Sequence, residues 1–195
     1  YLSNTANLWK NHNWKAILVE SDAERIKQVN HSNVIAINAT IGTDTNNSID
    51  YILNQQNITE VDFMSIDIDG NDYHILDNLI CQPRVICVEY NPTIPFWIDC
   101  YQEEEHYQFG ASLKALNRLA IGKGYFLVSV TDTNLFFVKN EYEDLFKKFE
   151  TEIPFIACYK HYISVITNYC GEYKIMGTPP YKMKTETLKN IIIKD

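Results

Sequence analysis

The sequence predicts an α/β fold with a doubly wound, Rossmann-like sheet, whose strands are mostly parallel and covered by helices on both faces. Four short, continuous runs of mainly β-branched apolar residues are typical of strands that are buried on both faces. Segments with helical spacing of apolar residues separate these runs. This alternation of strand and helix favours right-handed βαβ units, which build a parallel sheet.

The expected elements follow one another at regular intervals. Strands are expected at residues 16–20, 34–38, 61–67 and 84–90, and helices at residues 22–29, 48–56 and 72–80. Ser21 and Glu24 have the spacing of a capping box at the first of these helices. A helix at 111–123 then precedes two apolar runs, 124–130 and 135–138, which favour an antiparallel hairpin.

Two regions are less regular. Residues 91–110 combine aromatic residues, prolines and an acidic run without periodicity, which predicts a long functional loop. An amphipathic helix is expected at 141–149, and no pattern assigns the residues that follow it. A chain of 195 residues fits one domain, which we place at residues 1–140, with 141–195 as a C-terminal helix and extension packed on the same domain.

Composition excludes several classes of partner. The net charge is -8, from 17 basic and 25 acidic residues, and no cluster of Lys and Arg is present that would neutralise a nucleic-acid backbone. No apolar stretch approaches the roughly 20 residues that span a bilayer, and no signal-peptide pattern opens the sequence. The five cysteines contain no C-x-x-C pair and are expected as buried or free thiols. A cytoplasmic protein with neither a nucleic-acid nor a membrane partner is expected.

Polar residues follow the predicted strands at the points where ligands bind in open parallel sheets, beyond the carboxyl ends. Glu20 ends the first strand, where a carboxylate can accept hydrogen bonds from both hydroxyls of a ribose. Asn38 and Ala39 end the next strand, where a small residue leaves room for an adenine ring and an amide can bond its edge. Turn formation alone would also explain Asn38.

The segment Ser-Ile-Asp-Ile-Asp-Gly-Asn-Asp, at residues 65–72, is the most unusual in the chain. It brings the carboxylates of Asp67, Asp69 and Asp72 to one junction of strand and helix, where their repulsion must be offset by cations or hydrogen-bond donors. A methyl donor with sulfonium and ammonium groups is one such cation, and a divalent metal with oxygen ligands is another. Turn formation before Gly70 is the alternative for the first two aspartates, and helix capping is the alternative for Asp72.

The following strand ends in Glu89, with Asn91 two residues later. Sequential parallel strands are commonly neighbours, so both residues are expected beside the acidic segment, where they complete an oxygen-rich pocket. His74 and His106 lie near this crevice in the sequence, and either could take a proton from a hydroxyl at neutral pH. For each histidine, however, the sequence favours placement on a surface or on a helix face.

Several strings of the chain together resemble FkbM-type methyltransferases. They are residues 1–5 (YLSNT), 14–22 (WKAILVESD), 62–73 (DFMSIDIDGNDY), 84–91 (RVICVEYN), 109–113 (FGASL) and 123–125 (KGY). The likeness runs in order to about residue 140. It implies a Rossmann-like methyltransferase sheet and transfer of a methyl group from S-adenosylmethionine, typically to a hydroxyl of a sugar or small natural product.

The resemblance also implies roles for individual residues. It assigns Glu20 to the ribose of the cofactor, Asn38 to the adenine side and Asp67 to the methionine end. Ser21, Asp22 and Ala39 complete the set of candidate cofactor-binding residues. The candidate catalytic residues are Asp67, Glu89 and His106. If the reaction uses a divalent metal such as magnesium, the candidate ligands are Asp67, Asp69 and Asn91. The glycine-rich cofactor loop of the family would fall immediately before Tyr1, so we expect upstream residues that carry this loop and the first, central strand.

Three other functions remain open on sequence grounds. Asp67-Ile-Asp69 also has the form of a D-x-D metal site in a glycosyltransferase that uses nucleotide sugars. A methyltransferase-like fold without activity could bind a partner through residues 91–110. A dehydrogenase ranks last, because no strand ending supplies the pattern of a hydride site. The expected partner of an active methyltransferase is a small-molecule or saccharide acceptor, and the oligomeric state is left open.

Overall fold

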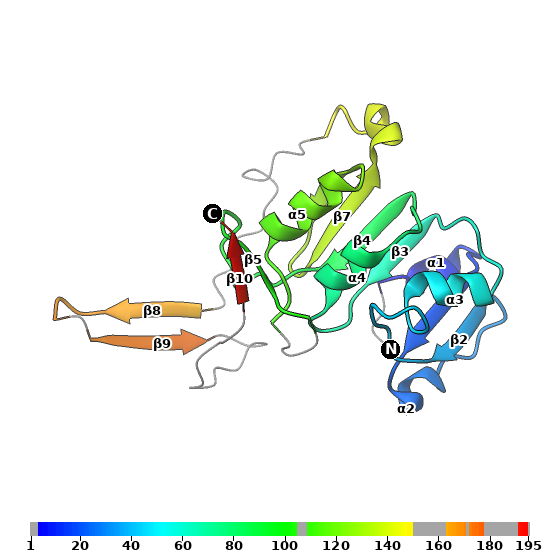
Figure 1. Cartoon of the computed structure of the whole chain (residues 1–195), viewed down its shortest axis with the longest axis horizontal. Helices are drawn as coiled ribbons and strands as arrows, with labels where there is room; N and C mark the ends of the chain where they lie inside the picture. Colours follow the sequence, from blue (N-terminus) through cyan, green and yellow to red (C-terminus); the bar gives the residue numbers. More distant parts are fainter. Residues whose placement is uncertain (1–3, 105–108, 150–162, 171, 178–190, 195) are drawn as a thin grey trace.

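The computed structural model describes residues 4–104, 109–149, 163–170, 172–177 and 191–194 (Figure 1). The helices are α1 (Ala6–Asn11), α2 (Ala23–Ile26), α3 (Ile49–Gln55), α4 (Asp72–Asn78), α5 (Leu113–Gly122) and the 3-10 helix η1 (Asn140–Leu145). The strands are β1 (Ala16–Glu20), β2 (Val34–Asn38), β3 (Phe63–Ile66), β4 (Val85–Glu89), β5 (Asp99–Gln102), β6 (Tyr125–Val130), β7 (Asn134–Lys139), β8 (Ile163–Thr167), β9 (Tyr173–Gly177) and β10 (Ile191–Lys194).

The strands form a mixed α/β arrangement (Figure 1). β1 pairs with β2 in parallel, and a four-stranded sheet has the order β3-β4-β7-β6. Within that sheet β3 and β4 are parallel, whereas β7 is antiparallel to both β4 and β6. The parallel units and the antiparallel hairpin are therefore confirmed. One continuous, doubly wound sheet is not confirmed, because β1 and β3 belong to separate sheets, and the expected upstream strand stays a prediction.

The prediction of a long loop throughout residues 91–110 is wrong for residues 99–102. These residues form β5, which pairs antiparallel with β10, so that Asp99 lies opposite Lys194. The partner strand β10 is distant in sequence, so no local sequence pattern around β5 predicts this pairing. β8 and β9 form a further antiparallel hairpin, while residues 150–162 and 178–190 of the expected extension lie outside the described residues.

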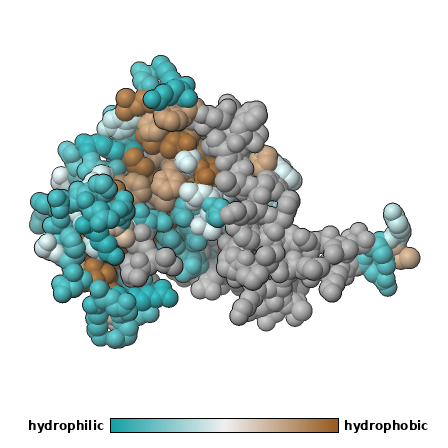
Figure 2. All heavy atoms as spheres, turned by 180° about the vertical axis from the view of Figure 1, so that it is seen from behind, coloured by the Kyte–Doolittle hydropathy of each residue, from teal (hydrophilic) through white to brown (hydrophobic). Residues whose placement is uncertain are grey.

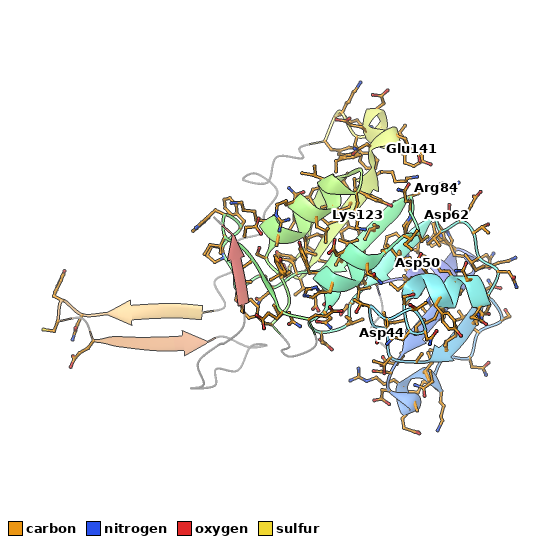
Figure 3. All side chains as sticks on the ribbon, viewed as in Figure 1. Asp44, Asp50, Asp62, Arg84, Lys123 and Glu141 are labelled. Atoms are coloured by element: carbon orange, nitrogen blue, oxygen red, sulfur yellow. The ribbon has the colours of Figure 1, made fainter. Side chains whose placement is uncertain are left out.

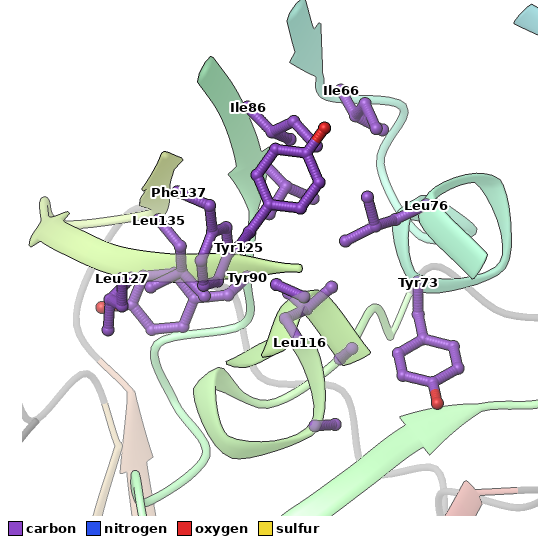
Figure 4. Close-up of a cluster of buried hydrophobic side chains, with 14 of the residues drawn as sticks. Ile66, Tyr73, Leu76, Ile86, Tyr90, Leu116, Tyr125, Leu127, Leu135 and Phe137 are labelled. Carbon is purple, nitrogen blue, oxygen red and sulfur yellow. The ribbon is translucent and has the colours of Figure 1, made fainter. Parts of the chain in front are cut away.

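The main core lies between the four-stranded sheet and helices α4 and α5. Alternate residues of β3, β4 and β7 point to this face because side chains alternate along a strand. Figure 4 shows Ile66, Ile86 and Phe137 of the sheet converging with Leu76 of α4 and Leu116 of α5. These side chains are almost fully buried, so the core fixes how the carboxyl ends of β3 and β4 lie relative to α4.

The other face of this sheet carries half-buried aromatic residues. The rings of Phe63 and Phe136 lie 6.4 Å apart, and the ring of Phe126 lies 5.8 Å from that of Phe146, just after η1. Figure 2 shows a hydrophobic area on the side of the molecule that is turned away in Figure 1. This face is thus apolar as well, as expected for a sheet with apolar contacts on both sides.

The structure differs from the helix predictions at the start of α2 and at residues 141–149. The expected capping box is wrong, because Asp22, not Ser21, is the N-cap of α2: its carboxylate accepts bonds from the backbone N–H groups of Glu24 and Arg25. The helix expected at 141–149 is instead the short 3-10 helix η1. No side chain caps its first turn, and short 3-10 turns are common where a segment is not extended into an α-helix.

The described residues bear on two expectations from composition. Within them, no helix is both long and apolar enough to cross a membrane. Cys81, Cys87, Cys100 and Cys170 are free thiols, as expected, and Cys158 lies outside the described part of the chain. Burial raises the pKa of the Cys87 thiol to about 12, so this cysteine is not a nucleophile at neutral pH.

Candidate active site

Five residues predicted to bind the cofactor come together where β1 and β2 end. Glu20 and Asn38 are register partners, and the Asn38 amide donates to the backbone oxygens of Glu20 at 2.8 Å and Ser21 at 3.0 Å. The backbone N–H of Ala39 also donates to the Glu20 backbone oxygen. The Glu20 carboxylate accepts the backbone N–H of Asp22 at 2.9 Å, which fixes its direction. A strand-end carboxylate held in this way is suited to pair with two neighbouring hydroxyls.

A second polar group lies at the ends of β3 and β4. Each of Asp67, Asp69 and Glu89 has a carboxylate oxygen within 4.8 Å of the others. Asp67 directly follows β3, and Glu89 ends β4, so the parallel pairing of the two strands brings the carboxylates together as the sequence predicts. Asp67 and Asp69 are exposed, whereas Glu89 is half-buried.

Asp72 holds the loop that carries these aspartates. It is the first residue of α4 and is buried, with 2% of its surface exposed. Its two carboxylate oxygens accept the backbone N–H groups of Ile68 and Gly70, each at 3.0 Å. Asp69, with φ of 59°, adopts a left-handed backbone conformation that aspartate tolerates better than most residues. Asp72 therefore acts inside the loop rather than as a ligand-facing residue.

The neighbouring carboxylates perturb the protonation of Asp67 and Glu89. Burial and the nearby charges of Asp67, Asp72 and Asp69 raise the pKa of Glu89 to about 8. Partial desolvation of its carboxylate and the Asp69 charge also raise the pKa of Asp67, although a hydrogen bond from Glu89 opposes that rise. Glu89 therefore keeps its proton near neutral pH and donates it to the Asp67 carboxylate. Such a pair is a typical perturbed site for proton transfer.

Comparison with known proteins gives one match. A family model described as the methyltransferase FkbM domain matches residues 9–119, which contain β1 to β4 and all of the polar residues described above. The chain belongs to the FkbM methyltransferase family. No curated protein and no solved structure matches the sequence. S-adenosylmethionine is the usual cofactor of such methyltransferases.

Asn91 and His74, which were also predicted at the site of this methyltransferase, contact backbone groups. The Oδ1 atom of Asn91 accepts the backbone N–H of Thr93 at 2.9 Å, and its Nδ2 donates to the backbone oxygen of Phe109. The Nε2 atom of His74 lies 2.8 Å from the backbone oxygen of Gln102, and His106 lies outside the described residues.

Sequence reasoning missed Gln102, the last residue of β5. Its side chain is buried and joins the loop after β3 to the segment at 109–110 of the methyltransferase. A glutamine in an aperiodic, acidic stretch carries no signal that it will be buried, and its partners are distant in sequence. The opposite end of the sheet, where Arg84 pairs with Asp62 (Figure 3), holds paired surface charges instead.

Proposed function

We propose that this chain transfers the methyl group of S-adenosylmethionine to a hydroxyl oxygen of a saccharide or small natural product. The observation that carries the proposal is the pair Asp67 and Glu89, whose carboxylate oxygens lie within 4.8 Å of each other at the ends of two adjacent parallel strands. Glu20 lies at the end of another strand of the same chain, in the position suited to a ribose. Membership of the FkbM family supports methyl transfer as the reaction.

Glu20 is proposed to hold the cofactor through its ribose. Its carboxylate is already oriented by the N–H of Asp22, and both ribose hydroxyls can donate to a carboxylate. Asn38 uses its amide N–H groups to hold the end of β1, which leaves its Oδ1 atom to accept a bond from the amino group of the adenine. The small side chain of Ala39 leaves space for the ring.

The carboxylates at the ends of β3 and β4 are proposed to act on the methionine end and on the acceptor. When bound, the cofactor supplies a methyl group on a positively charged sulfur, whose bond electrons return to the sulfur as the methyl leaves. The ionised Asp67 lowers the free energy of a bound cation and is placed to accept the proton of the attacking hydroxyl. Glu89 stabilises the Asp67 charge by its hydrogen bond until that proton arrives.

A divalent cation such as magnesium would fit the same oxygen-rich group. Asp67, Asp69 and Glu89 each offer one oxygen, and hard cations prefer such ligands. Asp67, Asp69 and Asn91 stay the set predicted from the sequence, and the engagement of Asn91 Oδ1 by Thr93 favours Glu89 as the third ligand. A bound cation would also draw the proton from Glu89.

The first experiment is calorimetric titration of the full-length protein with S-adenosylmethionine and S-adenosylhomocysteine. We expect saturable binding of both, and a loss of at least about tenfold in affinity in the variant Glu20→Ala, because two charge-assisted hydrogen bonds to the ribose are removed. Glu24→Ala is the matched control, because Glu24 is an exposed glutamate four residues away, paired with Lys27. Its affinity should equal that of the wild type.

Two results would contradict the proposal. If the protein binds neither compound, the cofactor assignment is wrong, and a titration with a nucleotide sugar and manganese then tests the glycosyltransferase alternative. If Glu20→Ala and Glu24→Ala bind equally well, the protein uses another site for the ribose. Binding that depends on Glu20 directs the next step to a screen of hydroxylated acceptors.

A further inference from the structure

Gln102 occupies an unusual position for a polar residue. It is the last residue of β5 and has 2% of its surface exposed, although it is followed by the exposed Glu103 and Glu104. Its backbone N–H donates to Gly110 at 3.0 Å, and its backbone oxygen contacts His74 at 2.8 Å. A buried amide must satisfy its donors and acceptors, so the partners of its side chain matter.

The hydrogen bonds of the Gln102 side chain fix the orientation of its amide. Its Oε1 atom accepts the backbone N–H groups of Phe109 at 2.8 Å and Gly110 at 2.9 Å. Two donors at one atom require that this atom be oxygen, so the other end is the NH₂ group. That group donates to the Oδ1 atom of Asn71 at 2.8 Å. Gln102 thus connects two separate backbone segments.

Each of these segments is linked to one side of the cluster of carboxylates formed by Asp67, Asp69 and Glu89. Asn71 follows Asp69 by two residues and begins the turn into α4. On the other side, the Asn91 side chain donates to the backbone oxygen of Phe109, and the Asn91 backbone N–H donates to Ala111 at 2.8 Å. Asn91 follows Glu89 by two residues. A continuous path of hydrogen bonds therefore runs from the loop of Asp69, through Gln102, to the loop that follows Glu89.

We propose that Gln102 is a positioning residue, which sets the separation between the loop of Asp67 and Asp69 and the end of β4 at Glu89. Its importance for methyl transfer rests on the function proposed above, whereas the positioning itself does not. Two carboxylates share a proton only while their oxygens stay within hydrogen-bonding distance, and a shift of about 1 Å disrupts such an arrangement. Loss of the Gln102 amide would let the two loops move independently.

The test compares variants by backbone amide hydrogen exchange and by NMR at constant pH. Gln102→Met keeps the volume of the side chain and removes all three side-chain bonds. We expect amide exchange in residues 67–72 and 109–110 to accelerate by about tenfold or more, and the amide resonances of Asp67, Asp69 and Glu89 to shift. Gln102→Glu keeps the acceptor for Phe109 and Gly110, and the Asn71 amide can rotate to donate to it, so this variant should largely restore the wild-type pattern.

A matched control separates positioning from a general loss of stability. Tyr125→Phe removes the buried hydrogen bond from Tyr125 to the backbone oxygen of Pro83, at the opposite end of β4. It should lower the melting temperature without changing amide exchange in residues 67–72 or the amide resonances of Asp67, Asp69 and Glu89. If Gln102→Met does not fold, Asn71→Ala tests the same link and should release residues 67–72 alone.

The proposal is overturned if exchange at 67–72 is unchanged in both Gln102→Met and Asn71→Ala, or if Tyr125→Phe changes it to the same extent. Its failure is distinguishable from failure of the proposed function, which calorimetry with S-adenosylhomocysteine decides. If the variants change amide exchange in these loops but the protein does not bind S-adenosylhomocysteine, Gln102 is the positioning residue of a site with a different function. If the protein binds S-adenosylhomocysteine but amide exchange in these loops is unchanged in the variants, only the role of Gln102 is rejected, and the proposed function stands.

Discussion

At the scale of single residues, the pKa of Glu89 links the candidate site to stability. Folding raises this pKa from the ordinary value of 4.5 to about 8, so between these pH values the folded state binds more protons than the unfolded state. The contribution of Glu89 to the stability of the wild type therefore falls as pH rises through this window. We predict that Glu89→Gln flattens this decline and, at pH 8.5, melts about 3 °C or more above the wild type.

Thermal unfolding at several pH values from 4 to 9 checks this prediction. Asp67 and Asp72, whose pKa values are also raised, first of all by burial, should preserve part of the decline in the variant. Glu24→Gln serves as the control, since its side chain is 81% exposed, and it should keep the wild-type slope. Identical slopes for wild type and Glu89→Gln would show that Glu89 titrates normally in the folded protein.

At the scale of elements, Ser112 joins helix α5 to strand β5. It is fully buried, and its hydroxyl oxygen accepts the N–H of Ala115 at 3.1 Å, as the N-cap of α5, and the N–H of Cys100 at 3.1 Å. Ser48 caps α3 with one such bond, to Tyr51. We predict that Ser112→Ala lowers the free energy of unfolding by about 2 kcal/mol, and Ser48→Ala by about 1 kcal/mol.

Urea denaturation measures both losses under the same conditions. Equal losses would mean that the bond from Cys100 to Ser112 contributes nothing, and that the junction of β5 and α5 depends on apolar contacts alone. A change in the slope of the unfolding free energy with urea would instead indicate that the folded or unfolded state changed in compactness.

Elements were predictable from the sequence where the signal is local. β1 and β2 match their predicted residues because a short continuous run of β-branched residues is a local signal for a strand. The prediction that these strands are buried on both faces is wrong for β2, in which Ile35 is 46% exposed. The meeting of Asp67 with Glu89 was also predictable, because it follows from the pairing of two consecutive parallel strands. β5 and Gln102 were not predictable, since their partners lie at β10, Asn71 and Gly110, and contacts between distant residues leave no periodic pattern.

At the scale of the whole molecule, the pair formed by Arg118 and Asp99 joins α5, α4 and β5. Asp99 is 6% exposed at its side chain, and Arg118 donates to both of its oxygens, at 2.8 and 3.2 Å, and to the hydroxyl of Tyr73 at 3.4 Å. We predict that Arg118→Met lowers the free energy of unfolding by about 3 kcal/mol, because it removes the guanidinium that pairs with a buried carboxylate.

A double variant, Arg118→Met with Asp99→Asn, should recover much of that loss because it also removes the charge of that carboxylate. Equilibrium unfolding of the two single variants and the double variant forms a complete cycle. If the losses simply add, the pair has no coupling, and the three elements are held together by the apolar core instead.

The strand order β3-β4-β7-β6 also has a consequence for the way this chain is made. Because β4 lies between β3 and β7, one of its edges stays unpaired during synthesis until residues 134–139 leave the ribosome. Until then Leu135 and Phe137, which complete the core, are absent as well, and Ile86 and Val88 remain in contact with water. A nascent chain with an open apolar strand edge is prone to aggregate. Formation of the hairpin of β6 and β7 removes this risk, because β7 then pairs with the open edge of β4 and completes the core.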